Sequence, residues 1–285
     1  MARILLLGCG QLTSQLPNFL SEHELIGIRR SSPDLPGIEL HQCDLTAPEE
    51  VEATLKAIGQ IDAVVYTATP SSRSESEYRK MYCCAPELVM MKLEALGQKP
   101  YWLHVSSTGV FRHNAGEWVH EDTQPAPETV ISKILYESEA LVEPYGKGAI
   151  LRLAGLYGQG RTYLLNSIKA GRQIQTTPWS YTNRIHREDA VRAIAFLLER
   201  ALANKASSEV EIFHGVDHDP APLHEVAQFL TNLHQLPAPV FFEATEGDII
   251  GSQNKRVANR KLIEEGFTFR YPTFRHGFAA RQEID

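Results

Sequence analysis

The sequence is poor in cysteine and has no apolar run long enough to cross a membrane. Its 285 residues include four cysteines, Cys9, Cys43, Cys83 and Cys84, and none stands in a C-x-x-C pattern. We therefore expect reduced, mostly buried thiols in a reducing compartment. No apolar stretch approaches the roughly 18 residues of a transmembrane helix. Strand-like sequence begins at Arg3, so we expect no signal peptide. These features predict a cytoplasmic protein without a membrane partner.

Positive charge is also in short supply. The chain has 28 lysines and arginines against 35 aspartates and glutamates, which gives a net charge of −7. This balance argues against a broad nucleic-acid-binding face. The eleven histidines show no strong zinc-ligand spacing, so we expect no bound metal. The 43% hydrophobic and 22% charged residues are typical of a globular chain and exclude a disordered one.

The first half of the chain alternates between two hydrophobic periods. The run at 4–7 is wholly apolar, as is typical of a strand buried on both faces, and further strands are expected at 25–28, 63–66, 102–105 and 150–153, with a weaker one at 38–43. Helical spacing appears between them at 12–20, 48–58, 74–96 and 130–142, with a break expected near Pro86. The segment 46–49 reads as a capping box. This alternation predicts an α/β fold with a doubly wound parallel sheet of Rossmann type.

The last third of the chain has a different pattern of helices, strands and prolines. A helix is expected at 188–202, a strand at 210–213, a helix at 223–233 and a strand at 240–242, with prolines clustered between them. We therefore expect a dinucleotide-binding domain formed by 1–155 plus about 185–216. A smaller, mixed substrate-binding region would comprise about 156–184 plus 217–285.

A glycine turn follows the first strand, where a dinucleotide-binding fold places its phosphate loop. Gly8 permits the tight turn and Gly10 lets the backbone approach a pyrophosphate, while the next helix would offer N–H donors. Thr13 stands where a third glycine is usual. We expect the turn residues Cys9, Gln11 and Leu12 to contact the cofactor as well.

The end of the second strand indicates which dinucleotide is bound. Arg29 stands 21 residues after Gly8 and is followed by Arg30. An acidic residue there would bind the ribose 2′-hydroxyl of NAD, whereas arginine suits the 2′-phosphate of NADP. The pair predicts that NADP is preferred over NAD.

Several further motifs occur in a fixed order, and together they resemble the extended short-chain dehydrogenase/reductase superfamily of NAD-dependent epimerases and dehydratases. The motifs are Asp44-Leu45, the 105–111 run VSSTGVF, Ser132-Lys133 with Glu137, the 151–161 run ending YGQGR, and the 184–189 run RIHRED. The resemblance covers nearly the whole chain. It implies a small-molecule substrate, of sugar or nucleotide-sugar type, and it allows a homodimer through the helices near 74–96 and 130–143.

The resemblance also assigns roles residue by residue. The implied cofactor contacts are Asp44, Leu45, Thr67, Ala68 and Lys133. The implied substrate contacts are Thr108, Tyr157, Arg161, Tyr181, Arg184 and His186. Ser107 would orient a substrate oxygen and Lys133 would hold the nicotinamide ribose.

The sequence departs from the family at the catalytic tyrosine, because Thr129 stands four residues before Lys133. An aliphatic hydroxyl is far less acidic than a phenol, so Thr129 cannot replace the family's acid or base. The loss is similar to that in atypical members of the superfamily. Two hypotheses follow. In the first, the chain is an oxidoreductase or epimerase whose proton donor is another side chain or the substrate, the candidates being Ser107, Thr108, Tyr157, Tyr181 and His186. In the second, it is a non-catalytic NADP-binding sensor or interaction module. The retained Ser107 and Lys133 favour the enzyme.

Overall fold

The computed structural model describes residues 1–31, 33–245 and 254–280, and it divides into two compact units. The first comprises Met1–Val110, Pro127–Arg152 and Val191–Phe213. The second comprises Phe111–Ala126, Leu153–Ala190 and His214–Asp285. The bounds differ from the expected ones, because 111–126, 153–155, 185–190 and 214–216 group with the second unit. Strand pairs inside that unit include parts of the two longer segments.

A seven-stranded sheet organises the first unit. Its order is β12-β7-β5-β4-β1-β2-β3, and the chain crosses over between neighbours as in a doubly wound fold. The strands are β1 (Arg3–Leu7), β2 (Glu24–Arg29), β3 (Glu39–Gln42), β4 (Ala63–Tyr66), β5 (Tyr101–Ser107), β7 (Gly148–Leu153) and β12 (Glu211–Gly215). The pairs β1–β2, β1–β4, β2–β3 and β4–β5 are all parallel. The predicted fold class is confirmed.

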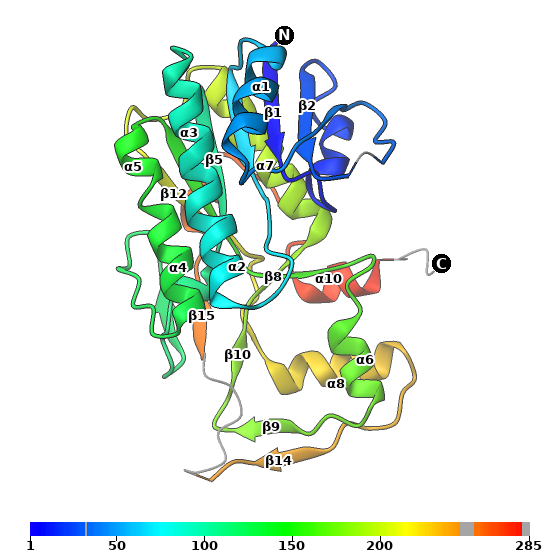
Figure 1. Ribbon diagram of the computed structural model, residues 1–285. Helices are drawn as coiled ribbons and strands as arrows, with labels where there is room; N and C mark the ends of the chain where they lie inside the picture. The colour runs from blue at the N-terminus through cyan, green and yellow to red at the C-terminus, as the bar shows by residue number, and fades with distance from the viewer. Residues whose placement is uncertain (32, 246–253, 281–285) are drawn as a thin grey trace. The chain divides into compact units, whose positions relative to one another are not determined.

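Helices cover the sheet because the apolar strands need burial on both faces. Figure 1 shows α1 (Pro48–Ile58), α3 (Ala85–Ala95) and α4 (Val130–Glu139) packed along the sheet, with α7 (Arg187–Leu202) running behind it. A short helix, α5 (Val142–Tyr145), follows α4. Buried side chains of α1 and α3, including Leu55 and Val89, pack with Leu5 and Val64 of the sheet in one hydrophobic core.

The predicted break near Pro86 takes the form of a π-helical turn. The helix runs as α2 (Glu75–Arg79), then the π segment η2 (Lys80–Cys84), then α3. Pro86 stands in the first turn of α3, where a missing N–H is tolerated. Both α2 and η2 contact α4.

Two local predictions were wrong. The segment after the glycine turn forms a short 3₁₀-helix, η1 (Thr13–Asn18), rather than an α-helix, because Pro17 inside it cannot donate the backbone hydrogen bond of a longer helix. The capping box at 46–49 does not form. Ala47 is the N-cap of α1, and the Thr46 hydroxyl donates to Asp44 Oδ1 at 2.7 Å instead.

The second unit is built from paired short strands and helices. Its strand pairs are β10 (Tyr181–Thr182) with β13 (Ala221–Pro222), β11 (Arg184–His186) with β8 (Gly155–Tyr157), β14 (Phe241–Glu243) with β9 (Ile174–Thr177), and β15 (Lys255–Val257) with β6 (Glu117–Val119). Its helices are α6 (Tyr163–Lys169), α8 (Leu223–Leu233), α9 (Arg260–Glu264) and α10 (Phe274–Ala279). Side chains of α6, α8 and α10, among them Ile168, Leu230 and Phe274, form its core.

The thiols are less buried than expected. All four cysteines are free, but only Cys9 and Cys43 are buried, whereas Cys83 is half-buried and Cys84 is exposed. Within the described residues, no helix has the length and apolar character needed to cross a bilayer.

Candidate functional site

A pocket of about 240 Å³ lies in the first unit at the carboxyl ends of β1, β2 and β4. Parallel α/β sheets bind nucleotides at this edge. The residues that line the pocket are Gly8, Cys9, Gly10, Ile28, Arg29, Arg30, Ser31, Cys43, Asp44, Leu45, Ala68, Thr69 and Met81. Eight of the predicted cofactor residues are therefore brought together here. Gln11, Leu12, Thr67 and Lys133 are not among the lining residues.

The first glycine is required by the backbone. Gly8 has φ +94°, and a Cβ on it would lie 2.5 Å from the backbone nitrogen of Ala68. The turn is held from both sides, because the hydroxyls of Thr67 and Thr13 donate to the Gly8 carbonyl at 2.7 Å and 2.9 Å. Thr67 thus braces the turn rather than lining the pocket.

The second glycine leaves open space where a ligand would lie. Gly10 also lines the pocket, and a Cβ on it would meet no heavy atom within 4 Å. The fold itself does not need a glycine there, whereas the approach of a pyrophosphate to the backbone does. The residues present therefore fit a dinucleotide. The six-residue η1 contributes little helix dipole, so the turn itself must supply the donors.

The two arginines at the end of β2 have different environments. Arg29 is half-buried and its Nη1 donates to the Cys9 carbonyl at 3.0 Å, so it fastens the glycine turn to β2. Arg30 is exposed and lines the same pocket. Burial raises the pKa of the Cys9 thiol to about 11, although Arg29 lowers it. The thiol is therefore protonated at neutral pH, which argues against a redox switch in the turn.

Asp44 holds its carboxylate ready for a hydrogen-bond donor on the ligand. Its Oδ1 accepts from the backbone N–H and the hydroxyl of Thr46, and these bonds lower the pKa of Asp44. The carboxylate is ionised at neutral pH and lines the pocket beside Leu45. An amino group on a base edge is the kind of donor this arrangement suits.

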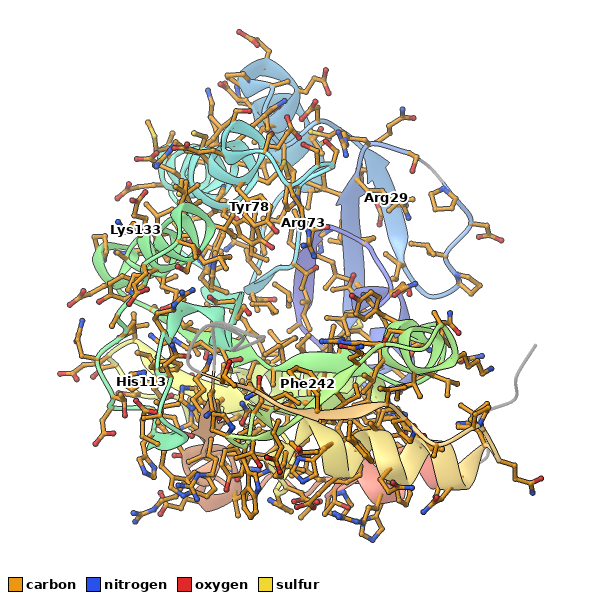
Figure 2. All side chains as sticks on the ribbon, turned by 90° about the horizontal axis from the view of Figure 1, so that it is seen from below. Arg29, Arg73, Tyr78, His113, Lys133 and Phe242 are labelled. Atoms are coloured by element: carbon orange, nitrogen blue, oxygen red, sulfur yellow. The ribbon has the colours of Figure 1, made fainter. Side chains whose placement is uncertain are left out.

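The three predicted catalytic residues lie on neighbouring elements of the first unit. Ser107 ends β5, Thr129 precedes α4, and Lys133 stands one turn into α4. Helix α4 packs against β5 and against the short 3₁₀-helix η3 (Thr108–Val110). Figure 2 shows Arg29 on β2 and Lys133 on α4 on opposite sides of this unit. A ligand reaching from β2 to β5 crosses the ends of β1 and β4, three strand spacings or about 14 Å.

The Thr129 side chain has a structural role. It is the N-cap of α4, with its Oγ1 accepting from the Ser132 backbone N–H at 3.1 Å and lying 2.9 Å from Ser132 Oγ. By contrast, Ser107 Oγ accepts from the Gly109 N–H at 3.1 Å, which leaves its own proton to donate. Lys133 is exposed. The structure thus makes an N-cap of the residue that the sequence resemblance aligns with the family's tyrosine.

Two further candidates for proton transfer are packed into the second unit. The Tyr157 hydroxyl points at α10, where it lies 3.4 Å from the Thr273 carbonyl, and burial raises its pKa. The His186 ring lies between Tyr157 and Tyr271, with centroid distances of 5.3 Å and 3.9 Å, and burial lowers its pKa. Both side chains are buried, and their packing holds the His186 ring and the Tyr157 hydroxyl against other residues of the second unit. The candidate Thr108 is buried in the first unit. The candidate Tyr181 lies in the second unit, with its ring centroid 5.0 Å from the Arg256 guanidinium.

A second pocket, of about 770 Å³, lies wholly within the second unit. Tyr157, Arg161 and Arg184 are among its lining residues, whereas Tyr181 and His186 are not. Arg184 is buried, with Nη2 2.5 Å from Thr182 Oγ1 and its guanidinium over Phe274. Burial raises the pKa of the neighbouring Asp217 to about 7, and Arg184 opposes that rise.

Sequence reasoning missed residues at both pockets. The first is completed by five residues that were not predicted as cofactor contacts, namely Ile28, Ser31, Cys43, Thr69 and Met81. Lys169 and His234 line the second, together with leucines of α6 and α8. The helical spacing of the α8 leucines is visible in the sequence. It indicates one apolar face, but it does not show that part of this face borders a pocket.

The sequence and the fold both have clear relatives. The RmlD substrate binding domain family matches residues 2–279. A protein from Methylobacillus flagellatus described as an NAD-dependent epimerase/dehydratase is 28% identical, with a TM-score of 0.78, over 98% of this chain and 97% of the other. A comparison with curated proteins gives no match.

Two more distant structures share the fold alone. The dTDP-glucose 4,6-dehydratase of Bacillus anthracis, solved with NAD, is 13% identical with a TM-score of 0.77, covering 98% of this chain and 94% of that one. The UDP-glucose 4-epimerase of Thermotoga maritima, solved with UDP-glucose, is 17% identical with a TM-score of 0.75, covering 97% and 96%. By its match over almost its whole length, the chain belongs to the RmlD substrate binding domain family, among the epimerase/dehydratase-like short-chain dehydrogenases/reductases.

Proposed function

We propose that the chain is an NADP-dependent oxidoreductase or epimerase acting on a small substrate. The observation that supports the proposal is the pocket at the end of β2, which is lined by both Gly10, with its open space, and Arg30. Relatives in the same fold are described as NAD-dependent epimerase/dehydratase or were solved with NAD. The arginine pair supports a 2′-phosphate over a free 2′-hydroxyl.

The roles of the residues follow from their positions. Gly8 and Gly10 shape the turn beside the pyrophosphate, Asp44 and Leu45 contact the adenine, and Arg30 pairs with the 2′-phosphate while Arg29 fastens the turn. Lys133 holds the far ribose, and Ser107 donates its proton toward a substrate oxygen. When bound, the dinucleotide would supply or accept hydride at a carbonyl or carbinol carbon. Thr129 moves no proton, because its hydroxyl caps α4.

A non-catalytic NADP-binding sensor is the second candidate. The capping role of Thr129 and the burial of Thr108, Tyr157 and His186 favour it, because they leave the half-buried Ser107 and Tyr181 as the remaining members of the predicted proton-transfer set. The two functions share the cofactor site. They differ in whether a carbonyl substrate oxidises bound NADPH.

NADPH should stabilise the protein at lower concentration than NADH does. At 100 times its dissociation constant a ligand stabilises by about 2.7 kcal/mol, which corresponds to roughly 5–10 °C in melting temperature. Arg30→Ala should remove most of the preference, since Arg30 is exposed and free to reach a phosphate. Arg29→Ala should weaken both dinucleotides, because it loosens the turn. Thermal melting measures both effects. Equal responses of the wild type to NADPH and NADH would refute the preference.

Replacing Thr129 should change stability rather than chemistry. Thr129→Ala removes an N-cap and should cost about 1 kcal/mol of unfolding free energy. Turnover of NADPH with keto-sugar or aldehyde substrates should stay at its low wild-type level. Thr129→Ser keeps the cap and serves as the matched control. A hundredfold loss of turnover in Thr129→Ala, with NADPH binding intact, would show that the threonine carries chemistry.

A further inference from the structure

The pocket in the second unit has an unusual division between charge and apolar surface. Its lining includes the cations Arg161, Lys169 and Arg184, and no carboxylate among the described residues. The remaining surface is largely apolar and comes from Leu156, Leu164, Leu165, Leu223, Leu230, Leu233 and Phe278. Its volume of about 770 Å³ lies within the range for small-molecule sites.

The neutral polar groups of the lining are largely committed to the protein. Both ends of the Asn183 amide bond backbone groups, with Nδ2 donating to the Lys255 carbonyl and Oδ1 accepting from the Val257 N–H, each within 2.9 Å. The Thr182 hydroxyl donates to the Ala221 carbonyl at 2.9 Å. Asn166 Nδ2 donates to Thr162 Oγ1 at 3.2 Å. A ligand rich in hydroxyl groups would therefore find few partners, and burying unpaired hydroxyls is costly.

One nitrogen of the Arg184 guanidinium lacks a hydrogen-bond partner among the described residues. Arg184 Nη1 is buried and bonds no described atom, although Nη2 of the same guanidinium is paired with Thr182. Nη1 is closed off from the pocket, and Asp217, whose Oδ2 is likewise buried without a hydrogen-bond partner among the described residues, interacts electrostatically with the guanidinium. Arg184 therefore adds positive charge to the pocket wall and is not itself a donor to a ligand. Arg161 and Lys169 are exposed and therefore free to turn toward the same ligand.

We propose that this pocket binds an anion carrying a hydrocarbon chain, such as an alkyl phosphate or a fatty carboxylate, rather than a nucleotide-sugar. Arg161 and Lys169 would hold the anionic head beside the buried charge of Arg184, and the leucines of α6 and α8 would enclose the chain. The inference rests on the proposed function in one respect, because it treats the ligand of this pocket as the substrate of the proposed enzyme. Binding in the pocket itself needs no dinucleotide.

Calorimetric titration of the full chain without dinucleotide tests the proposal. The probes are hexyl, octyl and decyl phosphate below their micellar concentrations, with decanoate, 1-decanol and UDP for comparison. Each added CH₂ group should tighten binding about threefold to fourfold. Decanol should bind at least tenfold more weakly than decyl phosphate. The ratio of the dissociation constants of decanoate and decyl phosphate shows which of the two head groups the pocket prefers. Tighter binding of UDP than of decyl phosphate, or no dependence on chain length, would overturn the proposal.

Variants place the binding in this pocket. The double change Arg161→Ala and Lys169→Ala should weaken the binding of decyl phosphate at least tenfold. Leu233→Asn should reduce the gain in affinity for each added CH₂ group. Both are expected to fold, because Arg161, Lys169 and Leu233 are all exposed. Arg260→Ala is the matched control, an exposed arginine of the second unit that pairs with Glu264 and is absent from the lining. Equal weakening by the control would refute the assignment. NADPH affinity should be unchanged throughout, so failure here is separable from failure of the cofactor site.

Discussion

Replacing Arg152 with methionine is expected to lower the melting temperature by about 6–20 °C. Arg152 and Glu139 are 1% and 3% exposed, and Arg152 Nη2 lies 2.7 Å from Glu139 Oε2, with Nε 3.1 Å from Oε1. Ser106 Oγ donates to the same carboxylate at 2.6 Å. Removing one partner of a buried pair typically costs about 3–5 kcal/mol, because the remaining charge is left uncompensated, and a chain of this length loses roughly 2–4 °C per kcal/mol.

The double variant distinguishes a buried charge from lost packing. Arg152→Met combined with Glu139→Leu removes both charges and should recover most of the lost stability, because apolar replacement of a whole buried pair is often neutral. The exposed pair of Arg79 Nη1 and Glu137 Oε2, 2.7 Å apart, is the control, and Arg79→Ala should cost less than about 1 kcal/mol. If Arg152→Met and Arg79→Ala shifted melting equally, the buried pair would not anchor α4 as the structure indicates.

Replacing Gly8 with alanine is expected to cost about 2–6 kcal/mol of unfolding free energy. The cost combines a left-handed backbone, at about 1–3 kcal/mol, with an overpacked contact of about the same size. The φ of +94° strains any side chain there, and the added Cβ would lie 2.5 Å from the Ala68 nitrogen. Chemical denaturation measures the change.

Gly10→Ala is the matched control for that experiment. A Cβ at Gly10 meets nothing within 4 Å, so its stability should change by less than about 0.5 kcal/mol. Equal destabilisation by the two variants would mean that the turn does not have the geometry described.

The sequence predicted the sheet well, because most of its strands contain a short run rich in apolar residues, which is a local property of the chain. The strand at 63–66 and the helix at 223–233 have the predicted bounds. The helix after Gly10 was mispredicted, because the prediction relied on the spacing of its apolar residues and ignored Pro17, which limits the segment to a short 3₁₀-helix. Periodicity reports which face of a segment is buried, and it does not report which kind of helix the backbone can form.

The parts of the site that are encoded by short motifs were predicted, and the parts that depend on tertiary structure were not. The glycine turn and the arginine pair are short motifs, and the structure gathers them in one pocket. The role of Thr129 was not readable, because an N-cap depends on where the helix begins, and helix ends depend on tertiary context. The charges and leucines of the second pocket come from β8, the turn at Arg161, β11, α6 and α8, so no local pattern could connect them.

The central claim is that the pocket at the end of β2 receives a nicotinamide dinucleotide across Gly10. Calorimetric titration of NADPH into the wild type and into Gly10→Ala tests it most directly. The wild type should give a saturable isotherm with one site per chain. Gly10→Ala should bind at least about tenfold more weakly, a loss of 1.4 kcal/mol or more, while its melting temperature stays within about 2 °C of the wild type. No saturable binding by the wild type at millimolar NADPH, or equal affinity in both proteins, would contradict the account.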